Sequence, residues 1–136
     1  MWDEIPLWEA EQETLYRDLM VSFGKPFFPK QAAPNRHYCS ENIMFPASDA
    51  FTLSAMIRHT RPKRIIEVGS GFSSATMLDT VDEIGLNCQL TFIEPYPDRL
   101  NALLRESDRE RCSVIEQPVP LRLHCESLRI PRLPLV

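Results

Sequence analysis

A short run of glycine, serine and glutamate offers the clearest chemistry in this chain. Glu67 is followed by Val68, Gly69, Ser70 and Gly71, directly after the β-prone residues RII. A strand that ends in glycines and turns at once into a helix gathers backbone N–H groups and the positive helix end at one point. Glycine suits such a turn because a Cβ would obstruct both the bend and the close approach of a ligand. The run therefore indicates a ligand-binding loop.

A second acidic residue adds to this interpretation. Glu94 ends the next β-prone run, QLTFIE. In Rossmann folds, an acidic residue at the end of the second strand binds ribose hydroxyls, and a carboxylate can accept both hydrogen bonds of a vicinal diol. Together the two features favour a ligand that contains a nucleoside. The structural alternative is that the glycines only form a turn and that Glu94 caps a helix beginning near Pro97.

The third glycine of a dinucleotide-binding fingerprint is absent. The pattern G-x-G-x-x-G would place it at position 74, where this chain has Ser74. A nicotinamide-dependent oxidoreductase fragment is therefore a disfavoured alternative. A non-catalytic remnant or interaction module, which keeps the fold without a ligand, is a second alternative from another functional class.

Two motifs resemble a known family. The stretch KRIIEVGSGFSS resembles motif I of class I S-adenosylmethionine-dependent methyltransferases, and TFIEPYPDRL resembles their motif II. The resemblance covers about residues 35 to 118, including an Asn-x-x-Phe segment (Asn42 to Phe45) and a helix running from Asp49 to Arg58. It implies a Rossmann-like parallel sheet with flanking helices, S-adenosylmethionine as the cofactor, and methyl transfer to an unidentified small-molecule or glycan-type acceptor.

The resemblance also implies a set of cofactor-binding residues. The two loop glycines would lie against the methionine and ribose part, Glu67 would orient the loop and reach the methionine amino group, and Glu94 would hold the ribose hydroxyls. Two serines would contribute hydrogen bonds, and Pro95 or Tyr96 would lie beside the adenine. The full set is Glu67, Gly69, Ser70, Gly71, Ser73, Glu94, Pro95 and Tyr96. Many members of the family have glycine at the place of Ser73.

The catalytic residues are not identified by the motifs. His37 and Tyr38 are the candidates for a base near the methyl group. In-line methyl displacement depends chiefly on holding the cofactor and aligning the acceptor. The only other task of the protein is to remove a proton from the acceptor where the reaction needs it.

The elements that position these residues alternate between helix and strand, which predicts an α/β fold with a parallel sheet. Ser48 and Asp49 offer a helix N-cap, Pro62 stops that helix, and Gly85 stops the next one. Apolar spacing and β-branched runs predict helices over about 4–20, 48–60, 73–84 and from 97 onward, and strands over 64–68, 89–94 and 113–116. The strand at 64–68 reads as buried.

Three parts are expected along the chain: an N-terminal helix and Pro-rich connector (1–34), the S-adenosylmethionine-binding half of a methyltransferase domain (35–118), and an irregular tail (119–136). By the family resemblance the fold is incomplete and truncated after the third strand, with about three of the usual seven. The first strand would then be an open edge. Weak cofactor binding and self-association through that edge are the expected consequences.

The amino-acid composition limits the partners, metals and cellular location that we expect for this protein. The 136 residues are 43% hydrophobic and 25% charged, as in one globular domain, and the net charge of −4 argues against a nucleic-acid partner. The four cysteines and three histidines show no metal-site spacing, so no metal is expected. With no signal peptide and no long apolar run, a cytoplasmic protein without a membrane partner is expected.

Overall fold

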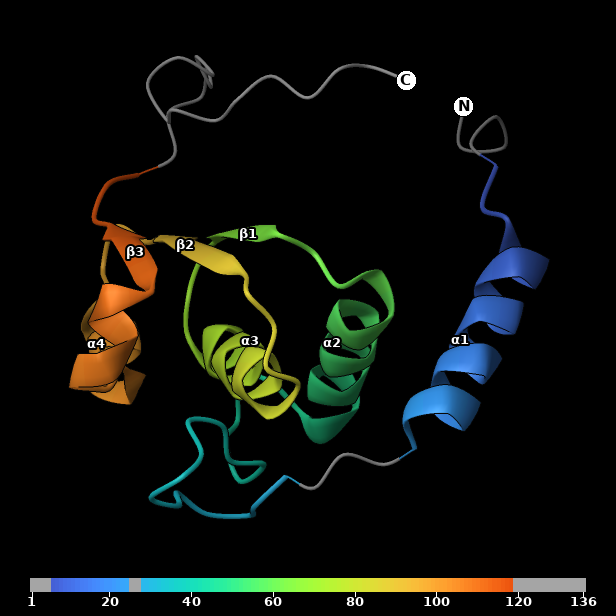
Figure 1. Cartoon of the computed structure of the whole chain (residues 1–136), viewed down its shortest axis with the longest axis horizontal. Coiled ribbons are helices and arrows are strands. Elements are labelled where there is room, and N and C mark those ends of the chain that lie inside the picture. The colour runs from blue at the N-terminus through green and yellow to red at the C-terminus, as the bar shows by residue number, and fades with distance from the viewer. Residues whose placement is uncertain (1–5, 25–27, 119–136) are drawn as a thin grey trace.

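The computed structural model describes residues 6–24 and 28–118, which form an α/β fold (Figure 1). The elements in chain order are α1 (Glu9–Phe23), α2 (Ala47–Thr60), β1 (Arg64–Val68), α3 (Phe72–Glu83), β2 (Gln89–Ile93), α4 (Asp98–Leu103), the 3-10 helix η2 (Glu106–Glu110) and β3 (Cys112–Ile115). The predicted alternation of helix and strand is confirmed. The irregular tail predicted for 119–136 lies outside the described residues.

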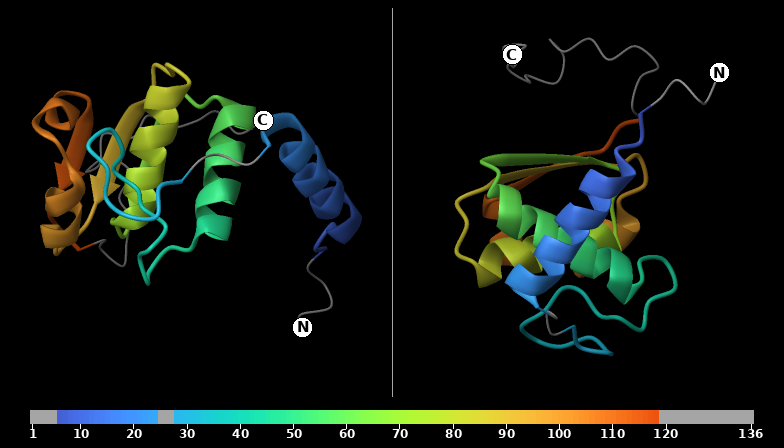
Figure 2. Two further views of the ribbon diagram at one scale, coloured as in Figure 1. Left: turned by 90° about the horizontal axis from the view of Figure 1, so that it is seen from below. Right: turned by 90° about the vertical axis from the view of Figure 1, so that its right-hand side faces the viewer.

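The three strands form one parallel sheet in the order β1-β2-β3. Ile66 of β1 is opposite Thr91 of β2, and Phe92 is opposite Val114 of β3. Because the strands are parallel, their carboxyl ends meet at one edge of the sheet, where the residues after β1 and β2 come together. Helices α2, α3 and α4 all lie on one face of the sheet (Figures 1 and 2).

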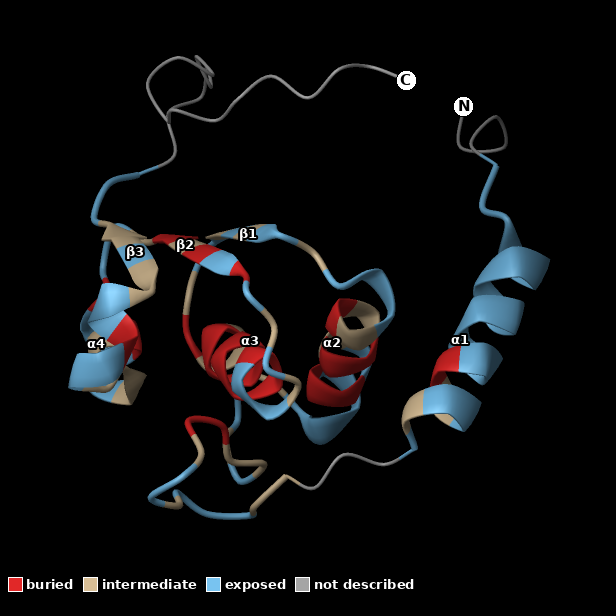
Figure 3. Ribbon diagram, viewed as in Figure 1, coloured by how far each residue is buried: buried red, intermediate tan, exposed pale blue. Residues whose placement is uncertain are grey.

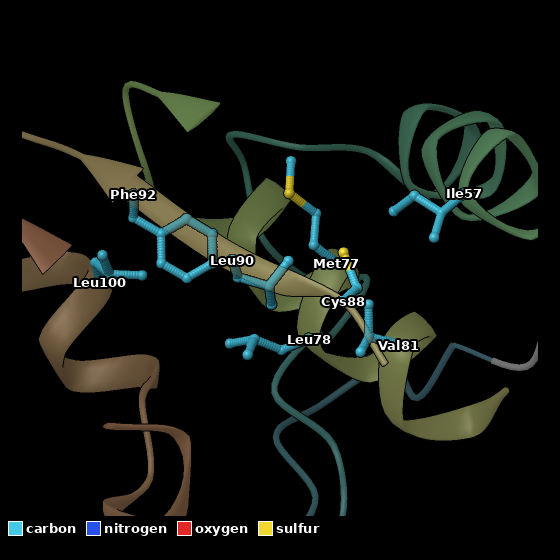
Figure 4. Packing of buried hydrophobic residues seen from close by; sticks show 8 residues of the cluster. All are labelled: Ile57, Met77, Leu78, Val81, Cys88, Leu90, Phe92 and Leu100. Carbon is cyan, nitrogen blue, oxygen red and sulfur yellow. The ribbon is translucent and has the colours of Figure 1, made fainter. Parts of the chain in front are cut away.

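The main core lies between this helix layer and the inner face of the sheet. Its buried members come from α2, α3, β2, α4 and the residue just before β2; they are Ile57, Met77, Leu78, Val81, Cys88, Leu90, Phe92 and Leu100 (Figure 4). Alternate residues of β2, Leu90 and Phe92, point into it because side chains on a strand alternate between the two faces. The core thus fixes β2, whose end carries Glu94, against α3.

Helices α2 and α3 run side by side with their N-termini at the same end. Along this contact Ser54 accepts a hydrogen bond from Thr80 (3.0 Å), and Arg58 pairs with Glu83 (2.9 Å). Ala50 and Ala75 are fully buried near the N-terminal ends. Small side chains there allow the two helices to approach closely.

Some element boundaries differ from the sequence prediction. Helix α1 begins at Glu9 rather than near residue 4 and buries only Leu19, so most of its surface is exposed (Figure 3). The N-cap predicted at Ser48 or Asp49 is wrong, because α2 begins at Ala47 and its N-cap is Pro46. The short helix η2 was not predicted, since its five residues are too few to show a periodic apolar pattern.

The prediction that β1 is a buried strand is wrong. Ile66 is 38% exposed and Val68 is 62% exposed, because described helices cover only the other face of the sheet. Within 6–24 and 28–118, β1 pairs with one neighbour, β2. Self-association through its second edge stays a prediction.

Candidate functional site

The loop from β1 to α3 carries the predicted glycines. Gly69 has φ +81°, a left-handed conformation that an L side chain rarely adopts, and no atom lies within 4 Å of the place where its Cβ would be. Its N–H donates to the Ile93 carbonyl (3.0 Å), which continues the β1–β2 pairing by one residue. Glycine is therefore required here by backbone conformation, and the loop surface at Gly69 is open.

Glu94 connects this loop to the end of β2. One carboxylate oxygen accepts the Ser70 N–H and the other accepts the Tyr96 N–H, each at 2.9 Å. These two hydrogen bonds from backbone N–H groups lower the pKa of Glu94, with a small further contribution from the positive charge of Arg99. These bonds favour the ionised form of the side chain and hold it beside the glycine loop, just after the end of β2.

Glu67 lies behind the loop and holds two serines. Its carboxylate accepts hydrogen bonds from the hydroxyls of Ser73 (2.5 Å) and Ser74. Ser74 Oγ in turn accepts the Gly71 N–H at 2.9 Å, which satisfies an N–H that the start of a helix leaves free. The chain of contacts Glu67, Ser74 and Gly71 therefore fixes the loop onto the first turn of α3.

Burial raises the pKa of the Glu67 carboxyl, and the nearby negative charge of Glu94 adds to this, while the hydrogen bonds from Ser73 and Ser74 oppose it. Two carboxylates thus face one short loop. A positively charged group bound there would relieve their repulsion, whereas an anion would increase it.

Ser70 provides the clearest sign of an unfilled hydrogen-bonding requirement. Among the described residues, its Oγ is the buried side-chain polar atom that has no hydrogen-bond partner. Buried hydroxyls normally have a partner, since leaving one unpaired costs about 1–3 kcal/mol. A ligand atom at the loop would supply it. The nearby Gly71 is also restricted, because its Cβ would lie 3.3 Å from Cδ of Arg99.

The last two predicted site residues follow Glu94 on the surface. Pro95 is exposed, and Tyr96 is 83% exposed with its N–H bonded to Glu94. All eight predicted cofactor-binding residues therefore lie at the carboxyl edge of the sheet. Glu67 is near the end of β1, Ser73 is in the first turn of α3, and the other six are in the loops that follow β1 and β2. Whether they bind a cofactor stays a prediction.

Sequence reasoning missed the role of Ser74. In the sequence this position is marked only by the absence of the third glycine, whereas in the structure its hydroxyl links Glu67 to the loop backbone. The available signal was its place at the third residue of α3, where a short hydroxyl side chain commonly contacts the helix start.

His37 and Tyr38 do not lie where a base could reach a substrate. Both are buried, and Tyr38 donates its hydroxyl to the Phe45 carbonyl at 2.8 Å. Both ring nitrogens of His37 contact carboxylates, those of Asp79 and Asp108, at 2.7 Å. In this conformation the two side chains are structural.

Two further features of the described chain bear on ligands and partners. Across 6–24 and 28–118, no cluster of three or more His, Cys, Asp or Glu residues is arranged to hold a metal ion. None of the helices in that same part of the chain is long and apolar enough to cross a membrane.

Comparison with known proteins leaves the family unassigned. No protein-family model matches the chain, and no solved structure matches it. An uncharacterized protein of Archaeoglobus fulgidus is 41% identical to this chain over 61 residues, which is 44% of this chain. The match spans only 28% of that protein's length, so the activity of the whole relative does not transfer.

Proposed function

We propose that this chain is the cofactor-binding portion of an S-adenosylmethionine-dependent methyltransferase that acts on a small-molecule or glycan-type acceptor. The observation that carries the proposal is the position of Glu94. Its ionised carboxylate lies at the end of β2 and is bonded to the loop that ends β1, where a ribose diol is bound in Rossmann-like sites.

The loop is better suited to a ligand without phosphate. Its three N–H groups are already engaged: Gly69 with the Ile93 carbonyl, Ser70 with Glu94, and Gly71 with Ser74. A pyrophosphate needs free N–H groups at this point, and it would also face the two carboxylates of the site. A sulfonium nucleoside with an ammonium group carries positive charge and no phosphate, so it fits both features.

Each residue of the site would have a separate role in binding such a cofactor. Glu94 would accept hydrogen bonds from the ribose hydroxyls, because each carboxylate oxygen keeps a free lone pair beside its bond to a backbone N–H. Ser70 Oγ would gain the partner that it lacks. Glu67 acts as a positioning residue, since both of its oxygens hold serines of α3. When bound, S-adenosylmethionine supplies an activated methyl group for an in-line displacement.

Titration calorimetry with two ligands tests the proposal. S-adenosylhomocysteine and NAD share an adenosine, but only NAD carries a pyrophosphate. We expect saturable heat with S-adenosylhomocysteine and none with NAD at the same concentrations. Tighter binding of NAD would reverse the assignment in favour of an oxidoreductase fragment, and no heat with either ligand, from a folded sample, would favour a non-catalytic module.

A further inference from the structure

A buried histidine outside the proposed cofactor site lies between two aspartates. The side chain of His37 is 1% exposed. Its Nδ1 lies 2.7 Å from Oδ1 of Asp79 in α3, and its Nε2 lies 2.7 Å from Oδ2 of Asp108 in η2. Three separate parts of the chain therefore meet at one imidazole ring.

Each aspartate accepts further hydrogen bonds besides the one from the His37 ring. Asp79 also accepts the backbone N–H groups of His37 and Tyr38, each at 2.9 Å. Asp108 also accepts the Arg105 N–H and the guanidinium of Arg111, each at 2.7 Å. With a carboxylate oxygen facing each ring nitrogen, the geometry favours the charged imidazolium form of His37, in which both nitrogens donate.

Further ion pairs surround this cluster. The neighbouring ion pairs join α3 to the residues packed around it: Arg111 with Asp82, Arg36 with Glu83, and Arg58 of α2 with Glu83. Burial alone would lower the pKa of His37, but the hydrogen bonds and charges of Asp79 and Asp108 outweigh it and raise that pKa. Burial of the two aspartates is likewise outweighed by their donors, and their pKa values are lowered.

The cluster anchors the chain segment between His37 and Phe45 onto the helix layer. Within the segment, Tyr38 donates to the Phe45 carbonyl, and Asn42 accepts the Phe45 N–H at 2.7 Å. The ring of Tyr38 packs with Ala50 and Ala75, and Phe45 packs against the same group. A neutral His37 would place a bare ring nitrogen against a carboxylate, which removes one hydrogen bond and adds repulsion at the anchor.

We propose that His37, Asp79 and Asp108 form a pH-sensitive latch, closed while His37 is protonated, whose opening releases the segment His37–Phe45 from α3 and η2. The proposal depends on contacts within this chain and not on a bound cofactor. Opening would expose Tyr38 to solvent, whereas in the closed state this residue is 1% exposed.

The direction of the pH dependence follows from proton linkage. In the open state His37 titrates near its ordinary value of 6.5, whereas in the closed state its pKa is higher. Between pH 3.8 and 6.5 both states bind the proton, so the opening constant is at its lowest and does not change with pH. Between 6.5 and the higher pKa each opening releases one proton, so the opening constant rises about tenfold per pH unit. At the acid end, the latch weakens only when the aspartates are protonated, below 3.8.

Amide hydrogen exchange read by NMR measures this opening directly, because the His37 and Tyr38 N–H groups are bonded to Asp79. We expect their protection factors to be constant between pH 3.8 and 6.5 and to fall about tenfold per unit above pH 6.5, until they level off. The imidazole of His37, followed in the same sample, should titrate above 6.5. Protection that does not change with pH, or a His37 that titrates at or below 6.5, would overturn the proposal.

Two variants separate the latch from other sources of pH dependence. In Asp108→Asn the amide N–H₂ can donate to the bare Nε2 of neutral His37, so the fall in protection above pH 6.5 should disappear. That variant loses the bond from the Arg105 N–H, which lowers stability without adding a titration. His59→Gln removes an exposed histidine of α2 and should keep the wild-type slope. An unchanged slope in Asp108→Asn contradicts the latch; if that variant does not fold, the wild-type titration of His37 decides.

Discussion

At the scale of single residues, the proposed site depends on one backbone conformation. Gly69 is left-handed, and open space surrounds the place where a Cβ would be. We expect Gly69→Ala to lower the free energy of unfolding by about 1–2 kcal/mol through backbone strain and to weaken S-adenosylhomocysteine binding. Gly85 is also left-handed but ends α3 far along the chain from the loop. Gly85→Ala should therefore lower stability in chemical denaturation while ligand affinity, measured by calorimetry, stays near the wild-type value. Equal losses of affinity would contradict this role for the loop.

The half-buried carboxyl of Glu67 leads to a second prediction at this scale. Its pKa is raised from 4.5 in the folded protein, so the unfolded chain loses this proton first and stability falls as pH rises from 4.5 toward the folded pKa. Glu67→Gln should remove that part of the fall. Denaturation midpoints between pH 4 and 7 measure it, with Glu116→Gln as the control, because Glu116 is exposed and follows β3. An identical pH profile for wild type and Glu67→Gln would show that Glu67 is not perturbed.

At the scale of elements, α2 packs closely against α3, the helix that directly follows the glycine loop. Ala50 is fully buried near the start of α2, where a larger side chain has no room. Ala50→Leu should lower the free energy of unfolding by about 1–3 kcal/mol, because overpacking forces the helices apart. Ala10→Leu, the same substitution on the exposed surface of α1, should have little effect. Thermal or chemical denaturation of both variants decides whether this contact is as tight as the structure shows.

The elements around the loop were the most predictable from sequence. The β-branched run before Gly69 and the alternation around Phe92 identify β1 and β2, because strand periodicity is a local property. The start of α2 was not predictable, since Pro46 takes the N-cap position ahead of the better capping residue Ser48. The exposure of Ile66 could not be predicted either, because the sequence does not show which face of a sheet is covered by helices.

The candidate site likewise combines features that local sequence reveals with features that only tertiary packing creates. Its eight predicted residues follow from two local motifs, whose strands the parallel sheet brings side by side. The cluster of His37, Asp79 and Asp108 gave no local signal, because its members are far apart in the chain and meet only through packing. Long-range polar contacts of this kind are set by the tertiary fold.

At the scale of the whole molecule, the described residues form a three-stranded sheet with helices on one face, and the main core lies between these two layers. Phe92 belongs to this core and is fully buried (Figure 4). Phe92→Ala should lower the free energy of unfolding by about 3–5 kcal/mol, which is a large part of the stability of a small domain. Val68→Ala, on the exposed face of the neighbouring strand, should have a small effect. Urea denaturation of both variants tests whether stability is concentrated in this core.

The most direct test of the proposed function measures S-adenosylhomocysteine binding to Glu94→Ala, with Glu116→Ala as the matched control. Both variants lose one carboxylate near the same edge of the sheet, but only Glu94 is bonded to the glycine loop. We predict saturable binding by wild type and Glu116→Ala, and at least tenfold weaker binding by Glu94→Ala, in line with the loss of charge-assisted hydrogen bonds. Unchanged affinity in a folded Glu94→Ala protein would contradict the assignment of this loop as the cofactor site.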